Sequence, residues 1–118
     1  MKSLIFSIAI FSILILLVIA NSIYIHTVCN EMLSISDSIS VNDIDATHEL
    51  CSLWQKNRIF FSISIHDSHI ERITELTENI KSAATVGDDA EFEKNIILLS
   101  ELLDTLKKNE EISLQGII

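Results

Sequence analysis

The chain contains no proline and only two glycines among its 118 residues. Tight hairpin turns depend heavily on glycine, so the sequence has little of the turn chemistry that a multi-stranded sheet needs. Two glycines also cannot form a glycine-rich loop that cradles a phosphate group. We therefore expect helices throughout the chain and no nucleotide-binding loop.

Basic residues are also scarce. Eight lysines and arginines stand against seventeen acidic residues, which gives a formal net charge of −9. Lys2 alone precedes the long apolar run described next, so the remainder carries seven basic residues and a net charge of −10. Such a surface repels nucleic acid and anionic lipid headgroups. Cations or basic protein surfaces are its natural partners, although the charge could simply keep the domain in solution.

The longest feature is an uninterrupted apolar and hydroxyl-bearing run from Leu4 to Ala20. Its seventeen residues would reach roughly 25 Å as a helix, and extension through Ile25 gives roughly 33 Å, enough to cross a bilayer. Tyr24 would then lie at the membrane–water interface. Because Lys2 is the only charged side chain before the run, the sequence predicts that the N-terminus is cytoplasmic. Residues 1–25 would then form a single-pass anchor that contacts the membrane through residues 4–25, and residues 26–118 would form an extracytoplasmic domain.

A cleaved signal peptide is the alternative to an anchor. Val18-Ile19-Ala20 is a small-x-small triplet that a signal peptidase could cut after Ala20, releasing a secreted helical protein. However, the apolar run exceeds the roughly 7 to 15 residues that are usual for a signal core. We favour the uncleaved anchor.

The rest of the chain has apolar residues at helical spacing. We predict an all-α fold, in which the N-terminal transmembrane helix is followed by a four-helix, two-hairpin antiparallel bundle. Helix starts are indicated by the turn Ser40-Val41-Asn42-Asp43, which contains an N-cap candidate, by Ser68-x-x-Glu71 and by Asp88-x-x-Glu91, and Gly87 indicates a helix end. The expected core stripes are Val28, Met32, Ile35 and Ile39; Thr47, Leu50, Cys51 and Trp54; Ile70, Ile73, Leu76, Ile80, Ala83 and Ala84; and Phe92, Ile96, Leu99, Leu103 and Leu106.

Residues 58–65 are ambiguous. Phe61, Ile63 and Ile65 alternate with serines at strand period, but a single strand would have no partner in this sequence. Helical spacing from Trp54 through Phe61 to Ile65 fits equally, and we favour the helix. Trp54 is expected to pack in the core, with its indole N–H donating to an acceptor.

Several motifs together resemble a known family. They are Trp54 in mid-chain, Ile65-His66-Asp67 before a helix with Ile70 and Ile73, the turn Gly87-Asp88-Asp89, the leucine-rich segment Leu98 to Leu106, and a terminal Glu111-Ile112-Ser113-Leu114-Gln115-Gly116-Ile117. In this order the chain is similar to the small bacterial membrane proteins grouped as domain of unknown function 4363, found mainly in spore-forming Gram-positive lineages. That family has no established activity, so the resemblance implies only an anchored helical domain.

His66, Asp67, His69 and Glu71 are the densest set of potential metal ligands. Two histidines three residues apart can share a cation on one helix turn, with a carboxylate completing the set. If Ser68 caps the helix, however, His66 precedes it and the shared face is lost. We favour a polar helix entrance without metal or other cofactor, and keep a cation- or ligand-sensing domain as the alternative function.

Cys29 and Cys51 lie at equal distances from residue 40, so an antiparallel hairpin would bring them to the same height, where they could form a disulfide. The alternative, which we favour, is two small apolar core side chains. Neither cysteine has the basic neighbours of a nucleophile.

The sequence carries no visible catalytic apparatus, so we expect a protein that is not an enzyme. Ile97, Leu98 and Leu102 lie beside the main stripe of the last helix and widen its apolar face. They could bind a protein partner or a second copy of the chain, or be buried within the bundle. We expect a membrane-tethered interaction or scaffolding module, in an envelope or sporulation setting.

Overall fold

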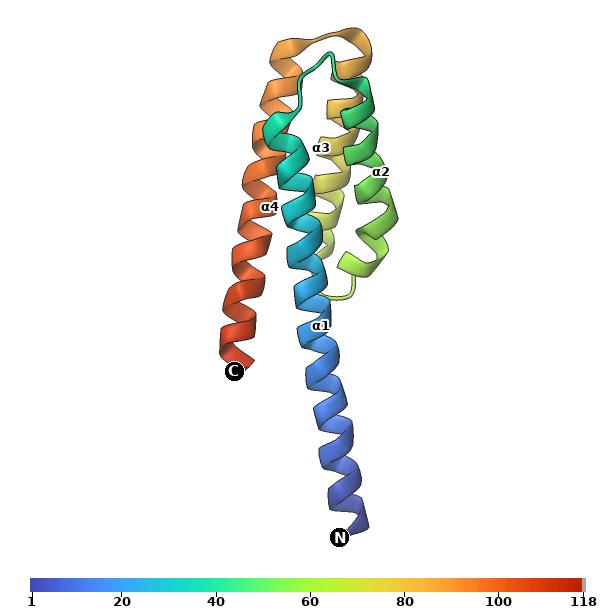
Figure 1. Ribbon diagram of the computed structural model, residues 1–118, viewed down its shortest axis with the longest axis vertical. Helices are drawn as coiled ribbons and strands as arrows, with labels where there is room; N and C mark the ends of the chain where they lie inside the picture. The colour runs from blue at the N-terminus through green and yellow to red at the C-terminus, as the bar shows by residue number, and fades with distance from the viewer. Residues whose placement is uncertain (118) are drawn as a thin grey trace.

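The computed structural model describes the backbone of residues 1–117, and within that range it contains helices and no strands. This confirms the predicted all-α class and the long apolar N-terminal helix. Figure 1 shows the four helices, which are α1 (Lys2–Ser38), α2 (Ile44–Phe61), α3 (Asp67–Val86) and α4 (Asp89–Ile117).

The helices form an up-and-down bundle in which each packs against its neighbours in sequence and α4 closes the ring against α1. The molecule is a rod of 66 × 22 × 22 Å, because α1 projects far beyond the other three helices (Figure 1). The predicted boundary between residues 25 and 26 falls inside this continuous helix. Burial of α1 side chains within the bundle begins at Ser22.

Two turns follow their sequence signals. The Asp43 carboxylate accepts a hydrogen bond from the Ala46 amide at 3.1 Å, and the Asp88 carboxylate accepts one from the Glu91 amide at 3.2 Å. Gly87 ends α3 in the left-handed region at φ 74°, which lets the Asp88 amide donate back to the Ala83 carbonyl. The predicted helix starts after the 40–43 turn and at Asp88, and the helix end at Gly87, are confirmed, and the structure identifies Asp43 as the cap of α2.

The predicted cap of α3 at Ser68 is wrong. The helix begins at Asp67, and its N-cap is His66, which has an extended backbone. The Nδ1 atom of His66 accepts a hydrogen bond from the Ser68 amide at 3.2 Å and lies 2.9 Å from the Ser68 hydroxyl. An imidazole nitrogen therefore satisfies the helix-start amide that a serine hydroxyl usually serves.

The ambiguous segment 58–65 is helical only as far as Phe61. Residues 62–65 form turns, which the Ile65 amide closes by donating to the Phe61 carbonyl at 2.8 Å. The helical prediction is thus correct for 58–61 and wrong for 62–65. Phe61 and Ile65 are both buried, because the chain turns back here to cover the end of the core.

The core lies between the four helices and contains most residues of the predicted stripes. Five stripe residues are only partly buried, namely Ile35, Ile39, Cys51, Ile70 and Ile96, and the core also includes Ile25, Cys29, Val41, Phe61 and Ile65. Trp54, at its centre, is fully buried; its ring packs edge-on to Phe61 at a centroid distance of 5.3 Å, and its indole N–H donates to the Thr74 hydroxyl at 2.9 Å. Burial of each large apolar side chain stabilises the fold by about 1.5–3 kcal/mol. The largest fully buried apolar side chains are Ile25, Met32, Leu50, Trp54, Phe61, Ile73, Leu76, Ile80, Phe92, Leu99, Leu103 and Leu106.

Candidate functional site

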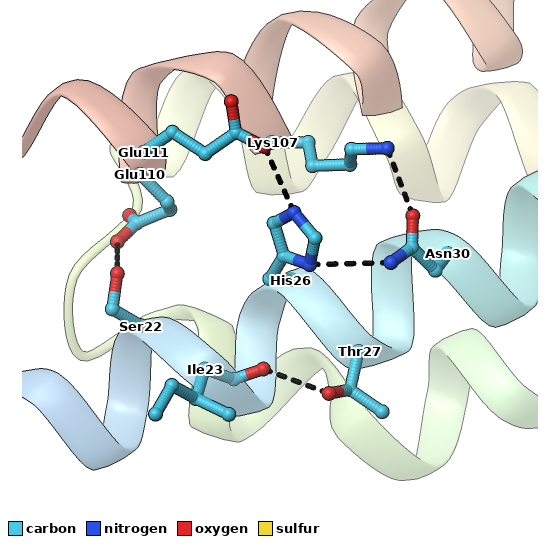
Figure 2. Close-up of polar contacts among 8 residues, drawn as sticks. All are labelled: Ser22, Ile23, His26, Thr27, Asn30, Lys107, Glu110 and Glu111. Carbon is cyan, nitrogen blue, oxygen red and sulfur yellow. Dashed lines mark hydrogen bonds and ion pairs between the residues drawn. The ribbon is translucent and has the colours of Figure 1, made fainter. Parts of the chain in front are cut away.

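A row of polar contacts joins α1 to the last turns of α4 (Figure 2). Ser22, His26 and Asn30 are four residues apart, so they share one face of α1. The Ser22 hydroxyl donates to Glu110 Oε2 at 2.7 Å, and His26 Nε2 lies 2.9 Å from Glu111 Oε1. We call these residues, together with Asn30 and Lys107, the α1–α4 ladder.

The hydrogen bonds of the ladder run in one direction, from the Lys107 ammonium through Asn30 and His26 to the Glu111 carboxylate. Lys107 Nζ donates to Asn30 Oδ1 at 2.9 Å, which leaves the Asn30 amide nitrogen to donate to His26 Nδ1 at 3.2 Å. Because Nδ1 then accepts, the proton of a neutral His26 lies on Nε2, where it is donated to Glu111. The contacts therefore fix the tautomer of His26.

The ladder is built to hold two helices together. His26 is 35% exposed and Glu111 50%, so water screens their interaction, and pairs of this kind contribute about 0.2–1 kcal/mol each. The regular spacing of Ser22, His26 and Asn30 shows that they share a helix face, but it does not identify their partners on α4.

The predicted metal candidates are not brought together. The rings of His66 and His69 meet edge-on at a centroid distance of 6.5 Å, and His66 Nδ1 is engaged in capping α3. Within the described residues, no group of three or more histidine, cysteine, aspartate or glutamate side chains, Asp67 included, is placed to hold a metal ion.

Both cysteines are free thiols. Cys29 is fully buried, and this burial, reinforced by the Glu110 carboxylate and opposed by Lys107, raises its pKa to about 12. Cys51 faces α3, where its thiol donates to the Thr77 carbonyl at 3.4 Å, and burial raises its pKa as well. Both thiols are thus held protonated at neutral pH, which is unfavourable for nucleophilic attack.

The three residues of the proposed contact face differ in exposure. Ile97 is 57% exposed on α4, whereas Leu98 and Leu102 are half-buried against the core. Of the three side chains, only that of Ile97 is more than half exposed.

An open apolar groove of about 500 Å³ lies where α1 leaves the bundle. Leu17, Ala20 and Tyr24 of α1 form one side, and Phe60 and Ile63 form the other. Tyr24 meets the Phe60 ring edge-on at a centroid distance of 5.7 Å. On the groove's polar margin, the Asn21 amide donates to the Ser64 hydroxyl at 2.8 Å.

Among the described residues, α1 is the one helix that is long and apolar enough to span a membrane, and its most apolar stretch is not buried within the protein. No family model, curated protein or solved structure matches the chain.

Proposed function

We propose that the chain is a single-pass membrane protein that carries an interaction module outside the cell membrane, with its N-terminus in the cytoplasm. The observation that carries the proposal is the bare N-terminal part of α1. Leu4, Phe6 and Phe11 are 64–70% exposed there, and no charged side chain lies between them and the bundle. An apolar surface of this extent needs an apolar environment, and an unbroken helix satisfies its own backbone inside a bilayer.

A non-enzymatic role fits the way the polar side chains are used. The α1–α4 ladder joins helices, His66 caps one, and burial holds both thiols protonated. We place the contact with a protein partner or a second copy at Ile97, with Leu98 and Leu102 beneath it. An envelope setting follows from the proposed position of the domain outside the cell membrane.

The anchor is tested by fractionating cells that express the full chain with a C-terminal tag. Intact protoplasts are treated with protease, and the N-terminus of the recovered protein is sequenced. We expect a membrane-bound chain beginning at Met1 or Lys2, whose tag is removed from outside. Recovery from the medium of a chain that begins at Asn21 would overturn the anchor, because the peptidase would then have cut behind Ala20.

The contact face is tested by photocrosslinking in the same cells. A benzophenone amino acid replaces Ile97 in one variant and the exposed Gln55 of α2 in a matched control. We expect a discrete adduct of fixed mass from position 97 only. Equal labelling at the two positions, or no adduct at position 97, would contradict the proposed face.

A further inference from the structure

Most of the exposed large apolar side chains of the bundle lie at one end, with Ile44, Val86 and Ile97 as the exceptions. Ile59, Phe60 and Ile63 at the α2–α3 connection are 71%, 51% and 73% exposed, and Ile23 and Ile112 are exposed on α1 and α4. The α2–α3 connection lies at the end of the bundle from which α1 projects (Figure 1). Scattered exposed isoleucines are ordinary on a protein surface, but a cluster at one end indicates contact with something apolar.

The distribution of charge follows the same division. Residues 3–30, 59–65 and 112–118 contain no aspartate, glutamate, lysine or arginine. The first two segments meet at the apolar groove, and Ile112 follows directly after the ladder residue Glu111. The described residues of these three segments therefore form an uncharged surface beside the apolar helix, bordered by Arg58, Asp67 and Glu111, while most of the acidic side chains belong to the rest of the bundle.

The groove at this end is continuous with the candidate span. Leu17 and Ala20, which form one side, belong to the apolar run itself, so a membrane that surrounds the run reaches the groove. Tyr24 and Phe60 then lie at the depth where aromatic rings are enriched at the membrane interface. A lipid acyl chain matches an open, apolar groove in this position, and the surrounding lipid supplies it at high concentration.

We propose that Phe60 and Ile63 insert into the outer interfacial layer of the bilayer and that the groove holds a lipid acyl chain. The bundle therefore contacts the membrane surface directly, with the α2–α3 connection facing the bilayer. This inference rests on the proposed membrane anchor, since without the span in a bilayer no lipid surrounds the groove.

Site-directed spin labelling of the full chain in phosphatidylcholine liposomes tests the proposal. A nitroxide is attached at Ile63→Cys, and accessibility to a water-soluble nickel chelate is compared with accessibility to oxygen. Ile97→Cys is the matched control, because Ile97 is a similarly exposed isoleucine away from the groove. Phe11→Cys reports on the span, and the unmodified chain gives the background from Cys29 and Cys51. All three substituted side chains are exposed, so the core should stay intact, which circular dichroism checks.

We expect the label at position 63 to be shielded from the nickel chelate several-fold relative to position 97, as at position 11. A shielded position 11 with equal accessibility at 63 and 97 would overturn the inference and leave the anchor standing. Accessibility at position 11 itself would overturn the anchor. Shielding at position 63 that disappears as the lipid-to-protein ratio rises would mean that a second copy covers the groove, and this result would also overturn the lipid assignment.

Discussion

Replacing Ser22 with alanine should loosen the C-terminal turns of α4. Ser22 is only 2% exposed, and its hydroxyl donates to the half-buried Glu110 carboxylate at 2.7 Å. Alanine removes this donor and adds no atom that could clash. The carboxylate then loses a charge-assisted hydrogen bond at the point where α4 contacts α1 (Figure 2).

The expected cost follows from the exposure of the two groups. A hydrogen bond to a charged group contributes about 1.5–3 kcal/mol when both partners are sheltered. Water can partly rehydrate the half-buried Glu110 carboxylate, so we expect about 1–2 kcal/mol. At 1.4 kcal/mol for each factor of ten, the end of α4 should open roughly 5 to 30 times more often.

Hydrogen–deuterium exchange of the full chain in lipid nanodiscs measures this opening directly. Amides of residues 107–112 should exchange faster in Ser22→Ala by that factor, while those of α2 and α3 keep their wild-type rates. The control is Thr105→Ala, which removes an exposed hydroxyl that bonds only within α4, to the Glu101 carbonyl. Unchanged exchange at 107–112, or the same acceleration in the control, would refute the role assigned to the ladder.

Three further predictions concern stability. Gly87→Ala should lower the free energy of unfolding, measured by chemical denaturation, by about 1–2 kcal/mol, because alanine disfavours the left-handed backbone at φ 74°. Steric contact is not the cause, since no atom lies within 4 Å of the added carbon. Wild-type stability in the variant would argue that the turn relaxes. Thr74→Val should lower the free energy of unfolding by about 1–3 kcal/mol, because it removes the acceptor of the Trp54 indole N–H. This loss should vanish in a Trp54→Phe background, and an equal loss in both backgrounds would assign the effect to packing. Burial raises the pKa of Cys29 from 9.0 to about 12, so the unfolded chain loses the thiol proton at a lower pH than the folded chain does. The contribution of this thiol to the free energy of unfolding is therefore fully present below pH 9, and the unfolding free energy falls by up to about 4 kcal/mol as the pH rises towards 12. Cys29→Ala should show a shallower alkaline decline in unfolding free energy than the wild type, and parallel declines would contradict the shift.

The regular parts of the fold could be predicted because local and tertiary preferences agree. Phe92, Leu99 and Leu103 recur at helical spacing and are all buried, and Gly87 ends its helix as a glycine at that position usually does. The cap of α3 could not be predicted from serine preference alone. His66 accepts from the Ser68 amide with a ring nitrogen, and a sequence pattern does not reveal whether His66 or Ser68, two residues later, becomes the N-cap.

The α1–α4 ladder was missed for a different reason. Ser22 and His26 lie at the end of a segment that the sequence identifies as a membrane anchor, where polar side chains are expected to face lipid headgroups or water. Their partners Glu110 and Glu111 are almost ninety residues away in the sequence. Only the closure of the bundle by α4 against α1 brings the two sets together, and one sequence carries no signal for that closure.

The unbroken course of α1 has a mechanical consequence. Its 37 residues contain neither glycine nor proline, so it has none of the usual causes of a sharp kink over a length of about 55 Å. In a bilayer, a domain joined to its span by such a continuous helix can rotate about the helix axis and diffuse laterally. It cannot reorient freely relative to the membrane, as a domain on a disordered linker does. Ile97 is thereby held at a nearly constant height, and a partner with a matching surface at that height meets it through a two-dimensional search at high effective concentration.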